Sequence, residues 1–373
     1  MGKSQPHTET ETEIETEDKP KFGQTVMEDL RRGDFQVTMK RDWRDVIQFY
    51  LDEENLNELK DMGAFKKWLF STWWLAKSLF FKLTPARRII LLISVVLFVN
   101  GADGMGATVV LSFLGLLLIL VLELKDKLLA QDELLSGRAV QLALMPDRSP
   151  QFEGWDIWLY TEPANDVGGD LVDYLHLADN RIGVVLGDIA GKGLPAALFM
   201  AKLQATIRAV APAIDSLSEL AQEINRIFWR DKLPNRFASL LYAELQAGEV
   251  GGGIVRLFNA GHMPPILMKS SDVSVLAAPG DMALGLVADA TFRELKLNLD
   301  SGDALVIYSD GVSEARNDSG DFYGEERLLA LLGRMRRQSA SSIGSAIVRS
   351  VDDFVGHARP SDDLSIVVIR RTP

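Results

Sequence analysis

Aspartates recur at the ends of apolar runs in the C-terminal part of this chain. Asp188 follows the run 184–186, and Asp310 follows the run 304–308. One such aspartate is weak evidence, because Asp and Gly occur in turns for backbone reasons. Several such aspartates together predict that their carboxylates lie close to one another in the fold. Carboxylates that lie close together repel one another and take up protons unless cations neutralise them. The segments are 165–170, 187–188, 306–314 and 359–365, the last with proline in place of glycine.

This pattern favours a site for divalent cations. Two cations bridged by a shared aspartate would neutralise the carboxylates and acidify a water held between them, which could then attack a phosphate group in line. The 373 residues include no cysteine, which excludes thiolate zinc sites and cysteine nucleophiles. The four histidines form no His-x-x-x-His pair, so a carboxylate site for Mg²⁺ or Mn²⁺ is favoured over zinc. A plain strand-turn-helix in which Asp188 caps the helix remains an alternative.

The order and wording of five motifs resemble the PPM-type metal-dependent protein serine/threonine phosphatases, in the bacterial sporulation and stress-response branch. The resemblance extends from about Gln141 to the C-terminus and implies an α+β fold, an αββα four-layer sandwich with two ions, Mn²⁺ or Mg²⁺, at one end of paired sheets. The motifs are 163–170, 187–193, 258–262, 309–315 and 361–365.

The resemblance also implies roles for individual residues. Asp188 is expected to bridge the two ions, and the carbonyl of Ile189 to bind one of them. Asp310 and Asp362 are expected to be direct carboxylate ligands, so that Asp188 and Asp310 are the central catalytic positions. Asp170 resembles the acidic residue that binds through water or holds an additional metal.

Other positions in the motifs leave more than one interpretation open. Glu314 and Asp363 are expected behind the direct ligands, with surface or capping carboxylates as the alternative. His262 could donate a proton to the leaving hydroxyl or could stabilise a turn. Ser309 stands where the branch usually has threonine, and no arginine near the start of the domain matches the phosphate-binding arginine of eukaryotic relatives.

Residues 148–373, the expected phosphatase domain, contain more short apolar strands than amphipathic helices. The strands come largely in hairpin order, which is typical of an α+β domain. We expect strands at 155–161, 171–177, 182–186, 239–245, 254–258, 265–268, 294–297, 304–308 and 364–369, and helices at 196–211, 216–229, 325–335 and 342–354.

The N-terminal part differs sharply in composition. Residues 1–25 contain a run at 8–18 that alternates Thr and Glu, and they are expected to be a disordered acidic tail. Residues 26–85 are expected to be helical and to include a basic-aromatic helix, 65–82, of the type that lies on a membrane surface.

Two apolar runs in 86–123 predict a transmembrane helical hairpin. Lys and Arg flank its outer ends and are absent from the connecting turn, which places both ends in the cytoplasm. We therefore expect contact with lipid in a bacterial cytoplasmic (inner) membrane, with the catalytic domain in the cytoplasm. A buried helical hairpin in a soluble domain is the alternative.

Residues 124–147 are expected to form a linker helix. Leu128, Leu135 and Leu142 recur every seven residues, as in a parallel coiled coil that would make the protein a homodimer. Gln131 and Arg138 interrupt the second apolar position, so an amphipathic helix docked on the following domain remains the alternative.

The function expected from the resemblance is hydrolysis of phosphoserine or phosphothreonine on a protein. The implied substrate is a phosphorylated STAS-type anti-anti-sigma regulator in a partner-switching pathway of sigma factor regulation. A net charge of −12 argues against nucleic acid as a partner. The alternatives are an inactive phosphoprotein-binding signalling module, a phosphatase of small phosphate esters, and a membrane receptor whose C-terminal domain is only structural.

Overall fold

The computed structural model describes residues 63–101, 106–231, 236–246, 252–276 and 280–372. Two compact units divide the chain, Met1–Lys125 and Asp126–Pro373. The expected acidic tail and most of the helical segment 26–85 lie outside the described residues.

The first unit contains helices that match the expected basic-aromatic helix and apolar hairpin. They are α4 (Ala64–Lys82), α5 (Pro85–Gly101) and the first part of α6 (Gly106–Leu144). Helices α5 and α6 contact each other, because Arg87 Nη1 lies 2.6 Å from Glu123 Oε1 and the Ser112 hydroxyl donates to the Ser94 carbonyl at 2.7 Å.

Helix α6 runs for 39 residues without a break at residue 123, so the second apolar run and the expected linker belong to one helix. Residues 120–135 contain neither Gly nor Pro, and their leucines, lysines and glutamates favour continued helix. Within the described residues, α6 is the one helix long and apolar enough to cross a membrane. Helix α5 has 17 residues, fewer than the roughly 20 that a membrane span needs. The membrane hairpin therefore stays a prediction.

The second unit contains two antiparallel sheets, as the α+β prediction requires. The first sheet has the strand order β1-β2-β11-β10-β7-β8 and the second β3-β4-β5-β6-β9. Strands β1 and β8 were not expected, because two or three residues carry no readable alternation. The first sheet contains β1 (Gln151–Phe152), β2 (Trp155–Glu162), β7 (Ile266–Met268), β8 (Val273–Val275), β10 (Ala304–Tyr308) and β11 (Leu364–Arg371). The second contains β3 (Leu171–Leu177), β4 (Arg181–Ile189), β5 (Ala238–Gln246), β6 (Gly252–Ala260) and β9 (Leu295–Asp300).

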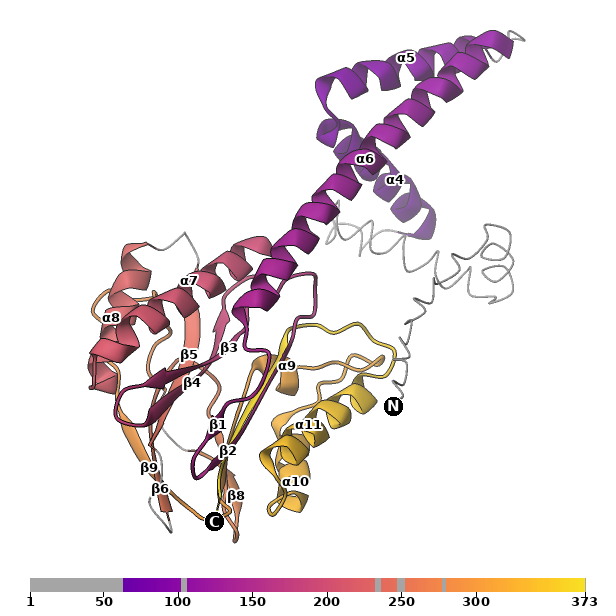
Figure 1. Ribbon diagram of the computed structural model, residues 1–373. Helices are drawn as coiled ribbons and strands as arrows, with labels where there is room; N and C mark the ends of the chain where they lie inside the picture. Colours follow the sequence, from indigo (N-terminus) through magenta and orange to yellow (C-terminus); the bar gives the residue numbers. More distant parts are fainter. Residues whose placement is uncertain (1–62, 102–105, 232–235, 247–251, 277–279, 373) are drawn as a thin grey trace, which may run out of the picture. The chain divides into compact units, whose positions relative to one another are not determined.

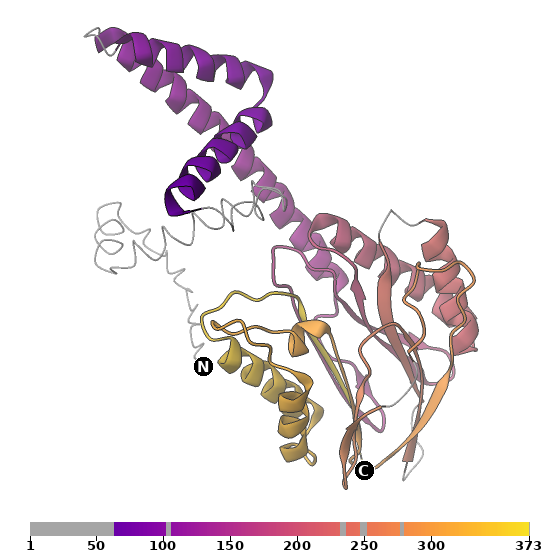
Figure 2. The same cartoon turned by 180° about the vertical axis from the view of Figure 1, so that it is seen from behind.

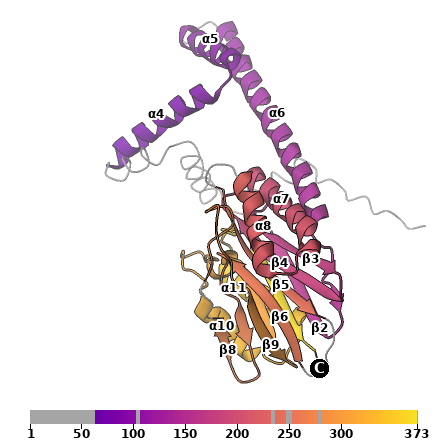
Figure 3. The ribbon, with the colours of Figure 1, turned by 90° about the vertical axis from the view of Figure 1, so that its left-hand side faces the viewer.

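Helices cover the outer face of each sheet, which gives the order helix, sheet, sheet, helix (Figures 1 and 2). Helices α7 (Leu194–Val210) and α8 (Leu217–Arg230) cover the second sheet, and Figure 3 shows them in front of its strands. Helices α10 (Glu325–Arg334) and α11 (Ala340–Val355) cover the first sheet. The α+β fold with two antiparallel sheets is thus confirmed.

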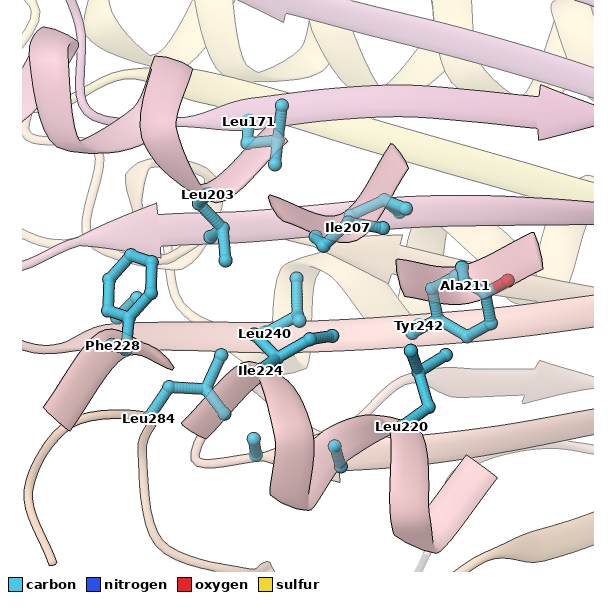
Figure 4. Packing of buried hydrophobic residues seen from close by; sticks show 14 of the residues in the cluster. Leu171, Leu203, Ile207, Ala211, Leu220, Ile224, Phe228, Leu240, Tyr242 and Leu284 are labelled. Carbon is cyan, nitrogen blue, oxygen red and sulfur yellow. The ribbon is translucent and has the colours of Figure 1, made fainter. Parts of the chain in front are cut away.

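Apolar side chains hold α7 and α8 on the second sheet (Figure 4). Leu203 and Ile207 of α7 and Ile224 of α8 are fully buried against β5, where Leu240 and Tyr242 face them. Truncating one such leucine or isoleucine to alanine typically costs about 2–5 kcal/mol, so this layer fixes the strand ends that carry the site.

Candidate metal centre

Antiparallel pairing brings two of the predicted aspartates to one end of the second sheet. Leu171, the first residue of β3, pairs with Gly187 near the end of β4. Asp170 immediately precedes Leu171, and Asp188 immediately follows Gly187. The two carboxylates, 18 positions apart in the chain, are therefore neighbours because a hairpin joins their strands.

The first sheet contributes the other two aspartates through an antiparallel pair of strands that are separated in the chain by three helices. Strand β10 ends before Asp310, and its partner β11 begins after Asp362. The Ser309 amide donates to the Ser365 carbonyl at 3.0 Å, and the Ser309 hydroxyl donates to the Asp363 carbonyl at 3.0 Å. The short helix α9 (Asp310–Ser313) and the 361–365 loop are thereby held side by side.

The side chain of Asp363 joins the two sheets at this end. Its carboxylate accepts hydrogen bonds from the backbone amides of Ala164 at 2.9 Å, Gly169 at 2.6 Å and Asp170 at 3.3 Å. A carboxylate that accepts hydrogen bonds from several backbone N–H groups holds the loop that contains those groups in place. Asp363 thus positions the segment before β3 against the segment before β11.

Gly169 leaves open the space in front of two predicted ligand oxygens. A Cβ atom at this position would lie 3.1 Å from the Ile189 carbonyl oxygen and 3.2 Å from Asp188 Oδ1. At Gly311, a Cβ atom would lie 2.0 Å from the Asp363 carbonyl oxygen. Glycine at both positions allows backbone and oxygen atoms to approach closely.

The carboxylates are close enough to change one another's protonation. Burial and then the charges of Asp310 and Asp362 raise the pKa of Asp188 to about 7. Burial and then the charge of Asp362 raise the pKa of Asp310, and burial followed by the charge of Asp188 raises the pKa of Asp170. These four aspartates, here called the acidic cluster, carry negative charge that the protein does not fully compensate.

The acidic cluster fits a hard divalent cation. Asp170 is 3% exposed, and its Oδ2 atom has no hydrogen-bond partner within the described part of the chain. All the donors are oxygens, as Mg²⁺ and Mn²⁺ prefer. Across the described residues, however, no three acidic or histidine side chains form a ready-made metal-binding group. Repulsion between the carboxylates opposes their closer approach.

Glu314 and His262 lie at the edge of this arrangement. Glu314 is exposed, and its charge contributes to the raised pKa of Asp310. His262 is 7% exposed, and burial lowers its pKa to about 4, so the ring is neutral at pH 7. Its Nδ1 atom lies 2.8 Å from the hydroxyl of Ser239, which stands opposite Asp188 in the β4–β5 register.

The same histidine is held by a local turn. The His262 amide donates to the side-chain oxygen of Asn259 at 2.7 Å, and the Asn259 amide group donates to the His262 carbonyl at 3.0 Å. Gly261 between them has φ of 71°, which favours glycine. These contacts support the turn-stabilising interpretation of the 258–262 motif.

Two contacts at the site were not expected from the sequence. The Gln141 side chain of α6 donates to the Gly168 carbonyl at 2.8 Å and accepts from the Gly168 amide at 3.1 Å. The Lys192 ammonium lies 3.1 Å from Asp362 Oδ2. The position of Lys192 between two glycines of the 187–193 motif could have identified it as part of the site. Gln141 lies within a helix, and no sequence feature distinguishes it.

Comparison with known proteins identifies the domain that carries this site. The family model described as Stage II sporulation protein E (SpoIIE) matches residues 178–372. Protein IcfG of Synechocystis is 26% identical over 266 residues, which cover 64% of this chain and 41% of IcfG. The chain thus spans less than half the length of that relative.

A second relative and a solved structure agree with this match. Phosphoserine phosphatase RsbU of Bacillus subtilis is 28% identical over 239 residues, which cover 62% of this chain and 68% of RsbU. The SiaA-PP2C domain of Pseudomonas aeruginosa superposes with a TM-score of 0.55 at 22% identity, covering 66% of this chain and 98% of that domain. The last comparison shows that the fold is of the PP2C type.

Proposed function

We propose that this chain hydrolyses phosphoserine or phosphothreonine on a regulatory protein in a reaction that depends on divalent cations. The chain belongs to the Stage II sporulation protein E (SpoIIE) family and is a PP2C-type serine/threonine phosphatase, and the proposal starts from this identity. The observation that supports the proposal most strongly is the acidic cluster. Its four aspartates come from segments up to 192 positions apart in the chain, and their negative charge is only partly compensated, by Lys192 beside Asp362.

The residues have distinct roles in this proposal. Asp188, Asp310 and Asp362 would hold two ions, Mn²⁺ or Mg²⁺, with the Ile189 carbonyl and Asp170 as further oxygen donors. Bound ions of this kind acidify a water and stabilise charge on a phosphate oxygen.

The remaining residues organise these donors. The Asp363 carboxylate and the Ser309 hydroxyl hold the loops in register through the hydrogen bonds described above. Glu314 stands behind Asp310 and contributes charge. His262 keeps a neutral ring beside Ser239 and supports the strand that pairs with Asp188.

Exposed apolar side chains near the site support a protein substrate. Leu194 is 42% and Leu198 62% exposed at the start of α7, and Phe237, immediately before β5, is 37% exposed. The Phe237 carbonyl accepts from the Ala190 amide at 2.9 Å, so this phenylalanine lies beside the turn that leads into α7. Apolar groups left in water at the rim of a site favour contact with another protein. We propose a STAS-type anti-anti-sigma regulator as that protein.

The proposed place of action is the bacterial cytoplasmic membrane. The apolar first half of α6, with mean hydropathy of 2.6 over its most apolar 18 residues, would lie in lipid together with α5. The catalytic domain would then lie in the cytoplasm.

We further propose that α6 joins two copies of the chain and carries a signal to the site. Leu128, Leu135 and Leu142 of α6 are each about half exposed and recur at the spacing of a coiled coil. Gln141 connects the same helix to Gly168 in the loop that precedes Asp170. A Leu135→Lys substitution should change both oligomeric state and activity, and unchanged values of both would remove this coupling.

The test of the function uses the full chain in detergent, with a phosphoserine STAS protein and an aryl phosphate as substrates. Phosphate release should require Mn²⁺ or Mg²⁺ and stop with EDTA. Asp310→Asn should lower kcat/KM by at least about 100-fold, while Asp272→Asn, an exposed aspartate in the β7–β8 turn, should leave it unchanged. Binding of the phosphoprotein without phosphate release would favour the inactive signalling module. Release from the aryl phosphate alone would favour a phosphatase of small esters.

A further inference from the structure

Lys192 brings a cation to the edge of the acidic cluster. It lies in the turn between β4 and α7, between Gly191 with φ of 111° and Gly193 with φ of 73°. Its ammonium group donates to the Ser361 carbonyl at 2.7 Å and lies 3.1 Å from Asp362 Oδ2. A lysine from the second sheet thus reaches the loop of the first sheet that carries a proposed metal ligand.

This lysine can change partner without disturbing the fold. Its side chain is 60% exposed and its stem has four carbon atoms, so the ammonium can move by rotation of exposed bonds. A divalent ion bound by Asp362 would compete with the ammonium for the same carboxylate. The released ammonium would then stand at the edge of the site with a positive charge and three donors.

The substrate supplies a suitable second partner. A phosphate monoester that enters the site is a dianion, and an ammonium released at the edge of the site can donate to its oxygens. Lysine is a common point-charge ligand of phosphate in proteins. The charge of Lys192 already acts on the cluster, because it lowers the pKa of Asp310 against the effects of burial and of Asp362.

We propose that Lys192 is a phosphate-binding residue that exchanges Asp362 for an oxygen of the phosphoryl group when Asp362 binds a metal ion. This inference rests on the proposed phosphatase function. In the metal-free site Lys192 neutralises Asp362, and in the loaded site it contacts the substrate phosphate and the inorganic phosphate product.

A purely structural role for Lys192 predicts the opposite change in metal affinity. If the lysine only tied the β4–α7 turn to the 361–365 loop, its loss would loosen the cluster and weaken metal binding. In the exchange described above its loss removes a competitor, and metal binding becomes tighter. An exposed ion pair contributes at most about 1 kcal/mol, so the gain in Mn²⁺ affinity is about two- to fivefold.

The experiment compares the full chain in detergent with Lys192→Gln, Lys192→Arg and the control Lys296→Gln, an exposed lysine of β9. Mn²⁺ binding is measured by calorimetry without substrate, and inhibition by inorganic phosphate is measured at saturating Mn²⁺. Lys192→Gln should bind Mn²⁺ two- to fivefold more tightly and be inhibited by phosphate about tenfold more weakly. Lys192→Arg should restore phosphate inhibition to within about threefold of the original chain, and Lys296→Gln should change neither constant.

Weaker Mn²⁺ binding in Lys192→Gln, or an unchanged inhibition constant for phosphate, would overturn the role given to Lys192. The failure of the proposed function is distinguishable from this result. In that case the unsubstituted chain itself would release no phosphate from either substrate.

Discussion

Two carboxylates on the neighbouring strands β4 and β5 have opposite surroundings. Glu244 of β5 is 4% exposed and accepts from Arg181 at 3.2 Å and from Arg256 at 2.8 Å. Asp188 of β4 faces other carboxylates, and its pKa rises to about 7 through burial and the charges of Asp310 and Asp362. A buried charge with its own counter-ions needs no further partner, whereas a partly buried charge among like charges requires a cation from outside.

Glu244, Arg181 and Arg256 are here called the paired cluster, and its arginines also contact other elements. The Arg256 guanidinium also binds Glu294 in a bidentate pair and donates to the Asp215 carbonyl at 2.8 Å. These bonds tie β6 to the residue before β9 and to the segment before α8. The paired cluster is therefore expected to affect stability, and the acidic cluster is expected to affect function at a cost in stability.

The largest expected effect comes from breaking the paired cluster. Glu244→Gln would leave two partly buried guanidinium groups without their shared carboxylate and should lower the free energy of unfolding by about 2–4 kcal/mol. Denaturant unfolding of the full chain in detergent measures this, with the exposed Glu326→Gln as the control. A loss no larger than that of the control would show that the pairing contributes no stability.

A comparable effect is expected from His262 when the pH falls. Its pKa of about 4 in the folded chain lies below the ordinary value of about 6.5, so between these values the unfolded chain takes up a proton that the folded chain does not. This histidine should therefore remove about 3 kcal/mol of stability as the pH falls from 6.5 to 4. In His262→Asn that part of the acid dependence should vanish, and parallel unfolding curves for the two proteins would contradict this.

A smaller change of opposite sign is expected at Asp188. Its pKa is raised in the folded chain, so metal-free stability falls as the pH rises from about 4 through 7. In EDTA at pH 8, Asp188→Asn should increase the free energy of unfolding by about 1–3 kcal/mol, and this gain should shrink as the pH falls and disappear at about pH 4. Equal destabilisation by Asp188→Asn and Glu244→Gln would remove the distinction between the two clusters.

The smallest expected effect concerns the neutral hydrogen bonds that hold the Asp170 loop. Gln141→Ala would leave the buried amide and carbonyl of Gly168 unpaired and should cost about 1–2 kcal/mol. Activity should fall several-fold, because the loop before Asp170 is less well held. Gln141→Glu keeps one acceptor for the Gly168 amide and should recover part of the stability. If Gln141→Ala leaves activity unchanged, the contact between α6 and the Asp170 loop does not influence the site.

Some features of the described part of the chain could be read from local sequence pattern, and others could not. Asp170 and Asp188 lie together because a hairpin pairs the strands 171–177 and 181–189, and this can be read from the apolar runs. Asp310 and Asp362 lie at the ends of strands that three helices separate in the chain, so the pairing of those strands cannot be read from local pattern. The continuity of α6 was not foreseen, because lipid-type and linker-type composition suggested two elements where the backbone forms one. The contacts of Lys192 and Gln141 depend on how loops distant in sequence approach each other, which local pattern does not determine.

Calorimetric titration of Mn²⁺ into the full chain and into Asp188→Asn tests the central claim most directly. If the acidic cluster is a metal centre, the unsubstituted chain should bind two Mn²⁺ ions tightly. Asp188→Asn should bind Mn²⁺ at least tenfold more weakly while its metal-free fold remains intact. Equal Mn²⁺ binding by the two proteins, or no binding by either, would show that the acidic cluster is not a metal centre.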